Sequence, residues 1–108
     1  MDTAETMKDK LHASLMKLTF IKLGLQIKIN RKHRGMSVPE LAKRAKVTSN
    51  RMRKIERGND YELKIDTLTR IAQAFDCAYD IIFITTEEKI KRISEEPEIV
   101  PTFTEETN

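Results

Sequence analysis

The sequence predicts a mainly α-helical protein with one β-strand near its C-terminus. Apolar residues recur at intervals of three and four along most of the first 75 positions, which is the period of amphipathic helices. Capping residues and glycines divide this part of the chain into separate helices. After Phe75 the pattern changes, because Ala78 to Thr85 is rich in β-branched and aromatic residues and is typical of a strand.

The first predicted element covers residues 11–34, where apolar side chains follow one another at helical spacing: Leu11, Leu15, Leu18, Leu23, Ile27. We expect one long helix, or two helices in sequence if Gly24 interrupts it, and Gly35 ends it. Residues 1–20 then form an N-terminal helical extension. A basic amphipathic helix can also lie on a membrane, but Leu23 and Ile27 are needed for a core, so no membrane partner is expected.

Two short helices follow between Ser37 and Gly58. Ser37 and Glu40 have the spacing of a capping box, and either Thr48 or Ser49 can cap the second helix. Gly58 provides a left-handed C-terminal cap. The inward residues form two narrow apolar stripes, with Val47 in the turn between them: Leu41, Ala42, Ala45, then Met52, Ile55. This layout is that of a helix-turn-helix.

The outward side of the second short helix is polar and strongly basic: Ser49, Asn50, Arg51, Arg53, Lys54, Arg57. A basic face that is merely solvated is common among proteins, and a charge run alone does not exclude that interpretation. However, Ser49 and Asn50 lie at the end that a recognition helix inserts into the major groove. Asn can bond adenine and Lys or Arg can bond guanine, so the face has the chemistry for reading bases.

The segment from Leu25 to Phe75 resembles the phage-repressor type of helix-turn-helix domain, also called the Xre or Cro-like family. The residues that carry the resemblance are Met36-Ser37, Glu40-Leu41-Ala42, Val47, Met52, Ile55-Glu56-Arg57-Gly58, Thr67-Leu68 and Ile71-Ala72. It implies a lambda-repressor-like helical bundle over residues 21–76 that binds double-stranded DNA.

Carried over residue by residue, the resemblance implies two sets of DNA contacts. The base contacts would be Ser49, Asn50, Arg53 and Lys54. The phosphate contacts would be Ser37, Val38, Arg51 and Arg57. It also implies a structural ion pair between Arg31 and Glu56.

The sequence departs from the family pattern at two places. Val38 stands where relatives often have a Gln that touches phosphate, so only the backbone N–H at this helix start can make that contact. The loop from Asn59 to Lys64 contains two acids where related domains often have cations. Phosphate contact from this loop is therefore not expected.

We expect a fourth helix over Thr67 to Phe75, capped by Asp66. The strand after it would pair across a two-fold axis with the same strand of a second copy, because a lone strand leaves its backbone unpaired. This dimer interface would contain five residues: Tyr79, Ile81, Ile82, Phe83, Ile84. A fifth helix or an intramolecular hairpin are the alternatives. Residues 77–94 thus form a dimerising strand and short helix, and 95–108 a disordered acidic tail.

The composition indicates a single small domain with an uneven distribution of charge. Between Lys17 and Lys64 there are 14 Lys and Arg against 4 Asp and Glu, a net +10 in a chain whose total is +3. This excess predicts nucleic-acid binding that weakens steeply with salt. Cys77 is the only cysteine and is expected to be a small buried side chain in a reducing cytoplasm.

Catalysis and cofactor binding are not expected. His12 and His33 have no neighbours at metal-ligand spacing, no Gly-rich phosphate loop is present, and no nucleophile arrangement is recognisable. The leading hypothesis is a cytoplasmic, bacterial or phage transcriptional regulator, most simply a homodimeric repressor that reads an inverted-repeat operator through residues 49–57. The alternatives are an antitoxin that also neutralises a toxin through its terminal extensions, and an accessory factor that binds DNA without sequence preference.

Overall fold

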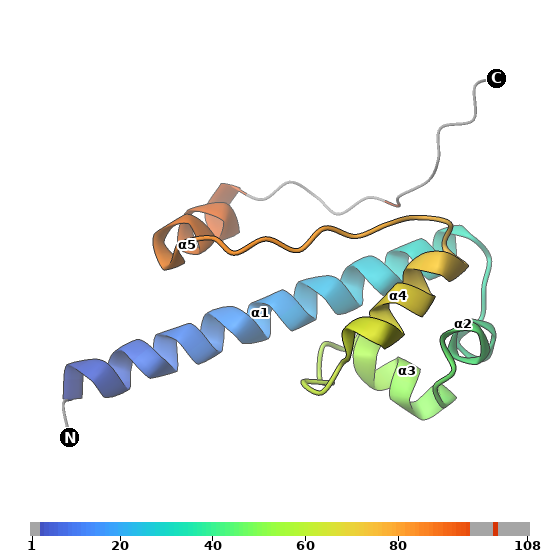
Figure 1. The fold of residues 1–108 in the computed structure, drawn as a ribbon, viewed down its shortest axis with the longest axis horizontal. Helices are drawn as coiled ribbons and strands as arrows, with labels where there is room; N and C mark the ends of the chain where they lie inside the picture. Colours follow the sequence, from blue (N-terminus) through green and yellow to red (C-terminus); the bar gives the residue numbers. More distant parts are fainter. Residues whose placement is uncertain (1–2, 96–100, 102–108) are drawn as a thin grey trace.

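The computed structural model describes residues 3–95 and 101, and the side chains from residue 6 onward within the first helix. The described residues form five helices: α1 (Thr3–His33), α2 (Val38–Ala45), α3 (Ser49–Glu56), α4 (Ile65–Ala74) and α5 (Thr86–Glu95). Figure 1 shows α1 as a long rod, with α2, α3 and α4 gathered at its C-terminal end and α5 beside its N-terminal half. The mainly helical fold expected from the sequence is confirmed.

The first helix is continuous through Gly24, so the chain does not divide there into two helices. This glycine has a packing role instead. A Cβ atom at Gly24 would lie 2.5 Å from the carbonyl oxygen of Ile55 and 2.6 Å from that of Glu56. The missing side chain therefore lets α1 approach the end of α3 closely. Gly35, with φ of +65°, follows the helix and allows the chain to turn back.

The core lies where the second half of α1 meets α2, α3 and α4. Its buried side chains come from all four helices and the turn after α1: Ile27, Met36, Leu41, Ala42, Ala45, Met52, Ile55, Leu68, Ile71 and Phe75. Val47 packs against this cluster from the turn between α2 and α3. Burial of these apolar surfaces is the main force that holds the short helices together, since eight-residue helices are not stable alone.

The fourth helix begins two residues earlier than the sequence predicts. Its N-cap is Lys64, whose side chain makes no capping hydrogen bond, and Asp66 lies in the first turn. The expected capping role of Asp66 is therefore wrong. Its carboxylate instead accepts a hydrogen bond from Arg70 Nη1 at 2.6 Å, one turn further along the helix. Arg70 Nε also donates to the Ala45 carbonyl at 2.7 Å, which joins α4 to the end of α2.

The strand expected at 78–85 is not found: no residue in the described part of the chain is in a β-strand. Residues 77–85 form an irregular connection from α4 to α5 that runs back along α1 (Figure 1). A strand requires a backbone partner, and the described part of this single chain supplies none to the segment. Ile81, Ile82 and Phe83 are accordingly exposed, with Phe83 fully so.

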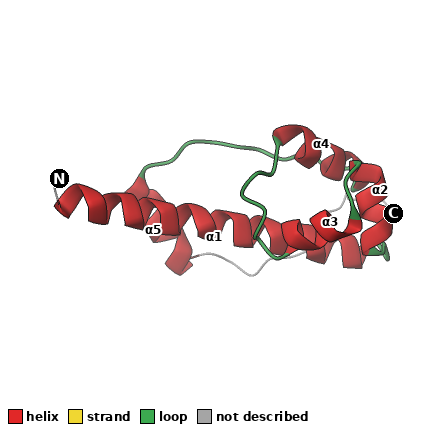
Figure 2. Ribbon diagram, turned by 90° about the horizontal axis from the view of Figure 1, so that it is seen from below, coloured by secondary structure: helices red, strands yellow, loops and turns green. Residues whose placement is uncertain are grey.

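The start of this connection is attached to α4 by side-chain contacts. The hydroxyl groups of Tyr79 and Thr69 lie 2.6 Å apart and share a hydrogen bond. Cys77 packs against the core but is only half-buried, less than the sequence suggested. Figure 2, seen from below, shows the connection lying away from the axis of α1 before it reaches α5.

The fifth helix confirms the short helix expected from Thr86 to Ser94 and extends it to Glu95. Thr85 Oγ1 accepts a hydrogen bond from Glu88 N at 3.1 Å at its start. The expected acidic tail lies outside the described residues, apart from Glu95 and Pro101. Among the residues that the structure describes, no helix is both long enough and apolar enough to cross a membrane.

Candidate DNA-binding surface

Local hydrogen bonds fix the start of α2 and the turn that leads from α2 to α3. Ser37 Oγ accepts from Glu40 N at 3.2 Å, and Glu40 Oε1 accepts from Ser37 N at 3.4 Å, which completes the capping box. Lys46 adopts the left-handed conformation after α2, with φ of 59°. Val47 N then donates to Ala42 O at 3.0 Å. The turn is therefore tight and closed by the backbone.

The third helix presents its polar face outward because two of its side chains are locked in the core. Met52 has no exposed surface and Ile55 is 2% exposed. Thr48 is the N-cap, and its hydroxyl accepts from Arg51 N at 3.1 Å. The sequence left open whether Thr48 or Ser49 has this role. A helix fixed at both its apolar stripe and its N-terminus has a defined rotation about its axis.

The candidate base-reading residues share the outer side of α3. Asn50, Arg53 and Lys54 are exposed, and Ser49 is half-buried at the first helical position. Arg53 Nη1 donates a long hydrogen bond of 3.4 Å to Asn50 Oδ1. Because this bond is exposed and weak, both groups can exchange it for a base edge at small cost.

The structure brings Arg31 of α1 and Glu56 of α3 together in a two-bond ion pair. Arg31 Nε lies 2.6 Å from Glu56 Oε2, and Nη2 lies 3.1 Å from Oε1. The third nitrogen, Nη1, donates to Met36 O at 2.8 Å. The two side chains are only 10% and 6% exposed. The carboxylate of Glu56 is thus paired within the domain.

A basic hollow lies over this ion pair, between the end of α1, the start of α2 and α3. It is lined by Lys28, Arg31, Lys32, Val38, Arg53, Glu56 and Arg57. Lys28 and Lys32 were not among the site residues expected from the sequence. Their spacing of four on the helix that carries Arg31 was the signal that could have identified them.

Val38 contributes to this hollow through its position at the start of α2. Ser37 and Glu40 bond to each other's backbone N–H groups, and Pro39 has no N–H. Val38 therefore carries the remaining N–H of the first turn, at the positive end of the helix dipole. An apolar side chain at this position does not prevent a backbone N–H from binding phosphate.

Arg51 has a structural partner that the sequence did not reveal. Its Nε donates to Asp60 Oδ2 at 2.9 Å, and its Nη2 donates to Glu62 O at 3.3 Å. Asp60 is only 5% exposed, and its second oxygen accepts from Glu62 N at 3.1 Å. Asp60, one of the two acids by which this loop departs from the family pattern, therefore holds the loop on α3.

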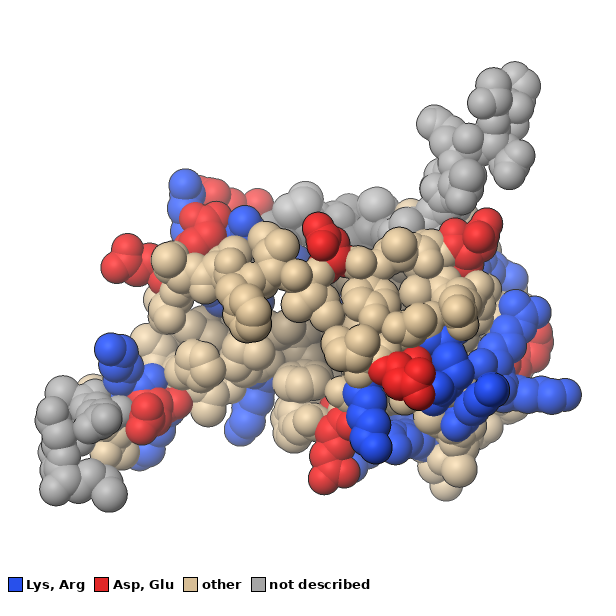
Figure 3. All heavy atoms as spheres, viewed as in Figure 1, with Lys and Arg blue, Asp and Glu red and all other residues tan. Residues whose placement is uncertain are grey.

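Lys and Arg side chains are unevenly distributed on the face shown in Figure 3. Lys and Arg side chains gather at the end of the molecule that holds α2 and α3, whereas uncharged side chains cover much of the rest of this face. This arrangement places much of the basic excess of the sequence on the helix-turn-helix and the end of α1 beside it. A surface of this kind attracts the phosphate backbone of DNA.

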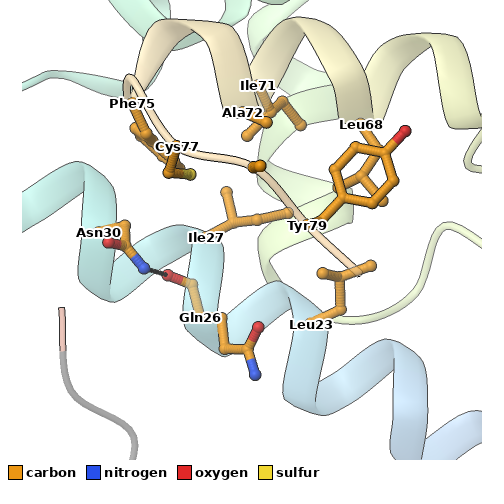
Figure 4. A pocket seen from close by; sticks show the side chains of 11 residues that line it. Leu23, Gln26, Ile27, Asn30, Leu68, Ile71, Ala72, Phe75, Cys77 and Tyr79 are labelled. Carbon is orange, nitrogen blue, oxygen red and sulfur yellow. Dashed lines mark hydrogen bonds between the residues drawn. The ribbon is translucent and has the colours of Figure 1, made fainter. Parts of the chain in front are cut away.

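No group of three or more His, Cys, Asp or Glu among the described residues could hold a metal ion. A small pocket of about 90 Å³ lies between α1 and α4, bordered by Leu23, Ile27, Phe75, Cys77 and Tyr79 (Figure 4). Ligand pockets usually measure about 300 to 1,000 Å³, so this one is a packing gap under the connection.

Comparison with known proteins agrees with the geometry of this surface. A search of curated proteins gave no match. The family model of the Cro/C1-type HTH DNA-binding domain matches residues 26–87, which is more than half of the chain and includes α2, α3 and α4. The chain therefore belongs to the family of Cro/C1-type helix-turn-helix DNA-binding domains.

Proposed function

We propose that this protein is a sequence-specific transcriptional regulator, and that it acts as a homodimeric repressor by occupying an inverted-repeat operator. The observation that carries the proposal is the outer face of α3. Its exposed side chains are hydrogen-bonding and cationic, and its one acid, Glu56, is neutralised by Arg31. An exposed recognition helix of this chemistry fits the major groove.

In this proposal the base edges are read by Asn50, Arg53 and Lys54, with Ser49 at the helix N-terminus. Asn50 can bond adenine through two atoms, and the cations can bond guanine. Arg53 has a double role, since it also borders the basic hollow. Its choice between a base and a phosphate depends on how deeply α3 enters the groove.

The phosphate backbone would be held on either side of α3. Arg57 and Val38 both border the hollow, where the N–H of Val38 could bind phosphate, and Lys28 and Lys32 extend the positive surface along α1. Ser37 adds its hydroxyl group at the start of α2. Arg51 already donates its Nε and Nη2 to the loop, so it would contact phosphate only through Nη1.

In this proposal residues 21–76 form the DNA-binding domain. Residues 77–94 form the dimer contact. The exposed segment from Tyr79 to Ile84 would become a strand by pairing antiparallel with its copy across a two-fold axis. Exposure of Ile81, Ile82 and Phe83, without backbone pairing in the described chain, supports this proposal. A dimer would present two α3 helices to half-sites roughly 34 Å apart.

The decisive experiment is a selection of bound sequences from random duplexes, followed by a salt titration on the winning site. The proposal predicts an inverted repeat and an affinity that falls steeply with salt concentration. If the protein bound DNA without a preferred sequence, the proposal would be wrong, and an accessory DNA-binding function would take its place.

A second candidate is an antitoxin, in which the same domain binds DNA and the terminal elements neutralise a toxin. The observation in its favour is that exposed apolar side chains concentrate on α1, α5 and the connection between α4 and α5. Co-expression with the protein encoded beside it tests this candidate. A stable complex that protects cells from that protein would favour the antitoxin over a simple repressor.

A further inference from the structure

Residues 7–25 of α1 carry an apolar stripe that lies mostly outside the core of the helix-turn-helix, although Ile21 packs against Gly58. Leu11, Leu18 and Leu25 are seven residues apart, and Met7, Ser14 and Ile21 form a second series with the same interval. Together the two series have the a and d spacing of a coiled coil over almost three heptads. We call these six residues the heptad seam.

The seam is exposed in the described structure. Met7 is 66% exposed, Ile21 50%, and the three leucines between 42% and 46%. The core uses another side of the same helix, through Leu23, Gly24 and Ile27. A contiguous apolar surface that stays largely exposed marks an interaction site more often than a scatter of single residues does.

Lysines occupy four of the six positions that border the seam, and the other two are the buried Leu15 and Gly24. At the positions that flank a coiled-coil interface, Lys8 and Lys22 lie on one side and Lys10 and Lys17 on the other. Lys8, Lys10 and Lys17 are exposed. The acid Asp9 falls on the opposite side of the helix, at position f of the heptad.

The fifth helix adds to this positive border. The pKa of Lys22 is lowered because the ammonium group is partly buried and because Lys89 and Arg92 of α5 lie nearby. Arg92 is itself paired with Glu88 at 2.9 Å. The cations of α1 and α5 together make this border attractive to negative charge.

These charges oppose pairing of the seam with its own copy. In a parallel pair Lys17 of one helix would face Lys22 of the other, and in an antiparallel pair each lysine border would meet itself. Like charges at such positions select against an otherwise suitable apolar partner. An anionic lipid surface also fits poorly, because the apolar residues of α1 are divided between the seam and the core and leave the helix weakly amphipathic as a whole.

We propose that the heptad seam binds an acidic amphipathic helix of a partner protein. Apolar residues of that helix would pack on Leu11, Leu18 and Ile21, and its Asp or Glu side chains would pair with Lys10 and Lys17. This inference does not rest on the proposed regulation of transcription, because the seam lies outside the residues that would contact DNA.

The test uses the full chain and two labelled model peptides of three heptads. Both have Leu at positions a and d; one has Glu at e and g, the other Lys. Fluorescence anisotropy should show that the Glu peptide binds, that its binding weakens as salt rises, and that the Lys peptide does not bind. Repulsion between their own side chains keeps each peptide from pairing with itself.

Two variants localise the binding. In Leu11→Ser/Leu18→Ser the affinity for the Glu peptide should fall at least about tenfold, because apolar contacts are lost from exposed positions that do not hold the fold. In Lys10→Glu/Lys17→Glu the affinity for the Glu peptide should fall roughly tenfold, and the Lys peptide should now bind. Ala13→Ser, an exposed change away from the seam, is the matched control. Circular dichroism should show unchanged helix content in all variants.

Three outcomes would overturn the proposal. One is equal binding of both peptides, or binding of neither, by the unchanged protein. Another is a dimer in sedimentation that Leu11→Ser/Leu18→Ser converts to monomer, because the occupant would then be a second copy. The third is binding to phosphatidylglycerol vesicles that the same variant loses while the Glu peptide does not bind.

Discussion

Arg31 and Glu56 join the first and third helices through two hydrogen bonds of 2.6 and 3.1 Å in a largely buried site. A third bond, from Arg31 to the carbonyl of Met36, uses the remaining nitrogen of the guanidinium group. The arrangement links the long helix both to α3 and to the turn before α2. The orientation of α3 therefore depends on a side chain of another helix.

Loss of this pair should destabilise the domain. Arg31→Ala leaves the Glu56 carboxylate buried without its partner, which typically costs about 3 to 5 kcal/mol. Thermal unfolding followed by circular dichroism should show a clear fall in melting temperature. Arg92→Ala is the matched control, since it breaks the exposed pair with Glu88 and should change stability by about 0.5 kcal/mol or less. Equal melting temperatures for the two variants would contradict a supporting role for Arg31.

A methyl group at position 24 should also destabilise the protein, although alanine is the better helix former. Gly24→Ala gains about 1 kcal/mol of helix propensity. Its Cβ, however, would lie 2.5 Å from a backbone oxygen of α3 that cannot move alone. We expect a net loss of at least about 1 kcal/mol, measured by urea denaturation, because overpacking commonly costs about 1 to 3 kcal/mol or more. Ser14→Ala, at an exposed position of the same helix, should be neutral or slightly stabilising. If Gly24→Ala proved the more stable of the two, the close approach would be disproved.

Two substitutions on α3 should separate sequence preference from general affinity. Replacing Asn50 and Lys54 together by Ala should remove most of the preference for the selected operator, at about 1 to 3 kcal/mol for each lost base contact. Arg57→Ala should weaken binding to all duplexes alike and lower the salt slope by about one. Electrophoretic mobility shifts with operator and scrambled duplexes at several salt concentrations measure both effects. A loss of preference in Arg57→Ala would show that the assigned roles are reversed.

Charged residues in the connection before α5 should produce monomers. Ile82→Asp or Phe83→Asp places a carboxylate in the proposed strand pair, where it would be desolvated without a partner. Sedimentation equilibrium should show a homodimer for the unchanged protein and monomers for both variants. Leu18→Ser, in the heptad seam, should leave the dimer intact. A dimer that survived both aspartates would place the interface elsewhere.

The sequence predicted the parts of this structure that depend on nearby residues. The capping box of Ser37 and Glu40, the left-handed Gly58 and the short helix after Thr85 are local, and all three are present. The start of α4 was missed because Asp66 is a favoured capping residue, yet its carboxylate is bound by Arg70.

Features that depend on distant contacts were harder to predict. Nothing near Gly24 in the sequence reveals that α3 crosses it, so the glycine resembled a helix breaker. Arg51 was grouped with the outward cations because its partner Asp60 lies beyond the end of the helix. The segment from Ala78 to Thr85 has the composition of a strand, but composition cannot supply the backbone partner that a strand requires.

The uninterrupted course of α1 has a mechanical consequence. Its 31 residues form a rod about 46 Å long at 1.5 Å per residue, and one end of that rod is built into the domain that holds DNA. A partner bound near Leu11 would lie at a fixed distance from the DNA-binding domain and at a fixed angle about the helix axis. Each residue inserted between positions 12 and 20 would rotate that partner by about 100° relative to the DNA. The length of this helix would therefore set both the distance and the relative rotation between bound DNA and a partner bound near Leu11.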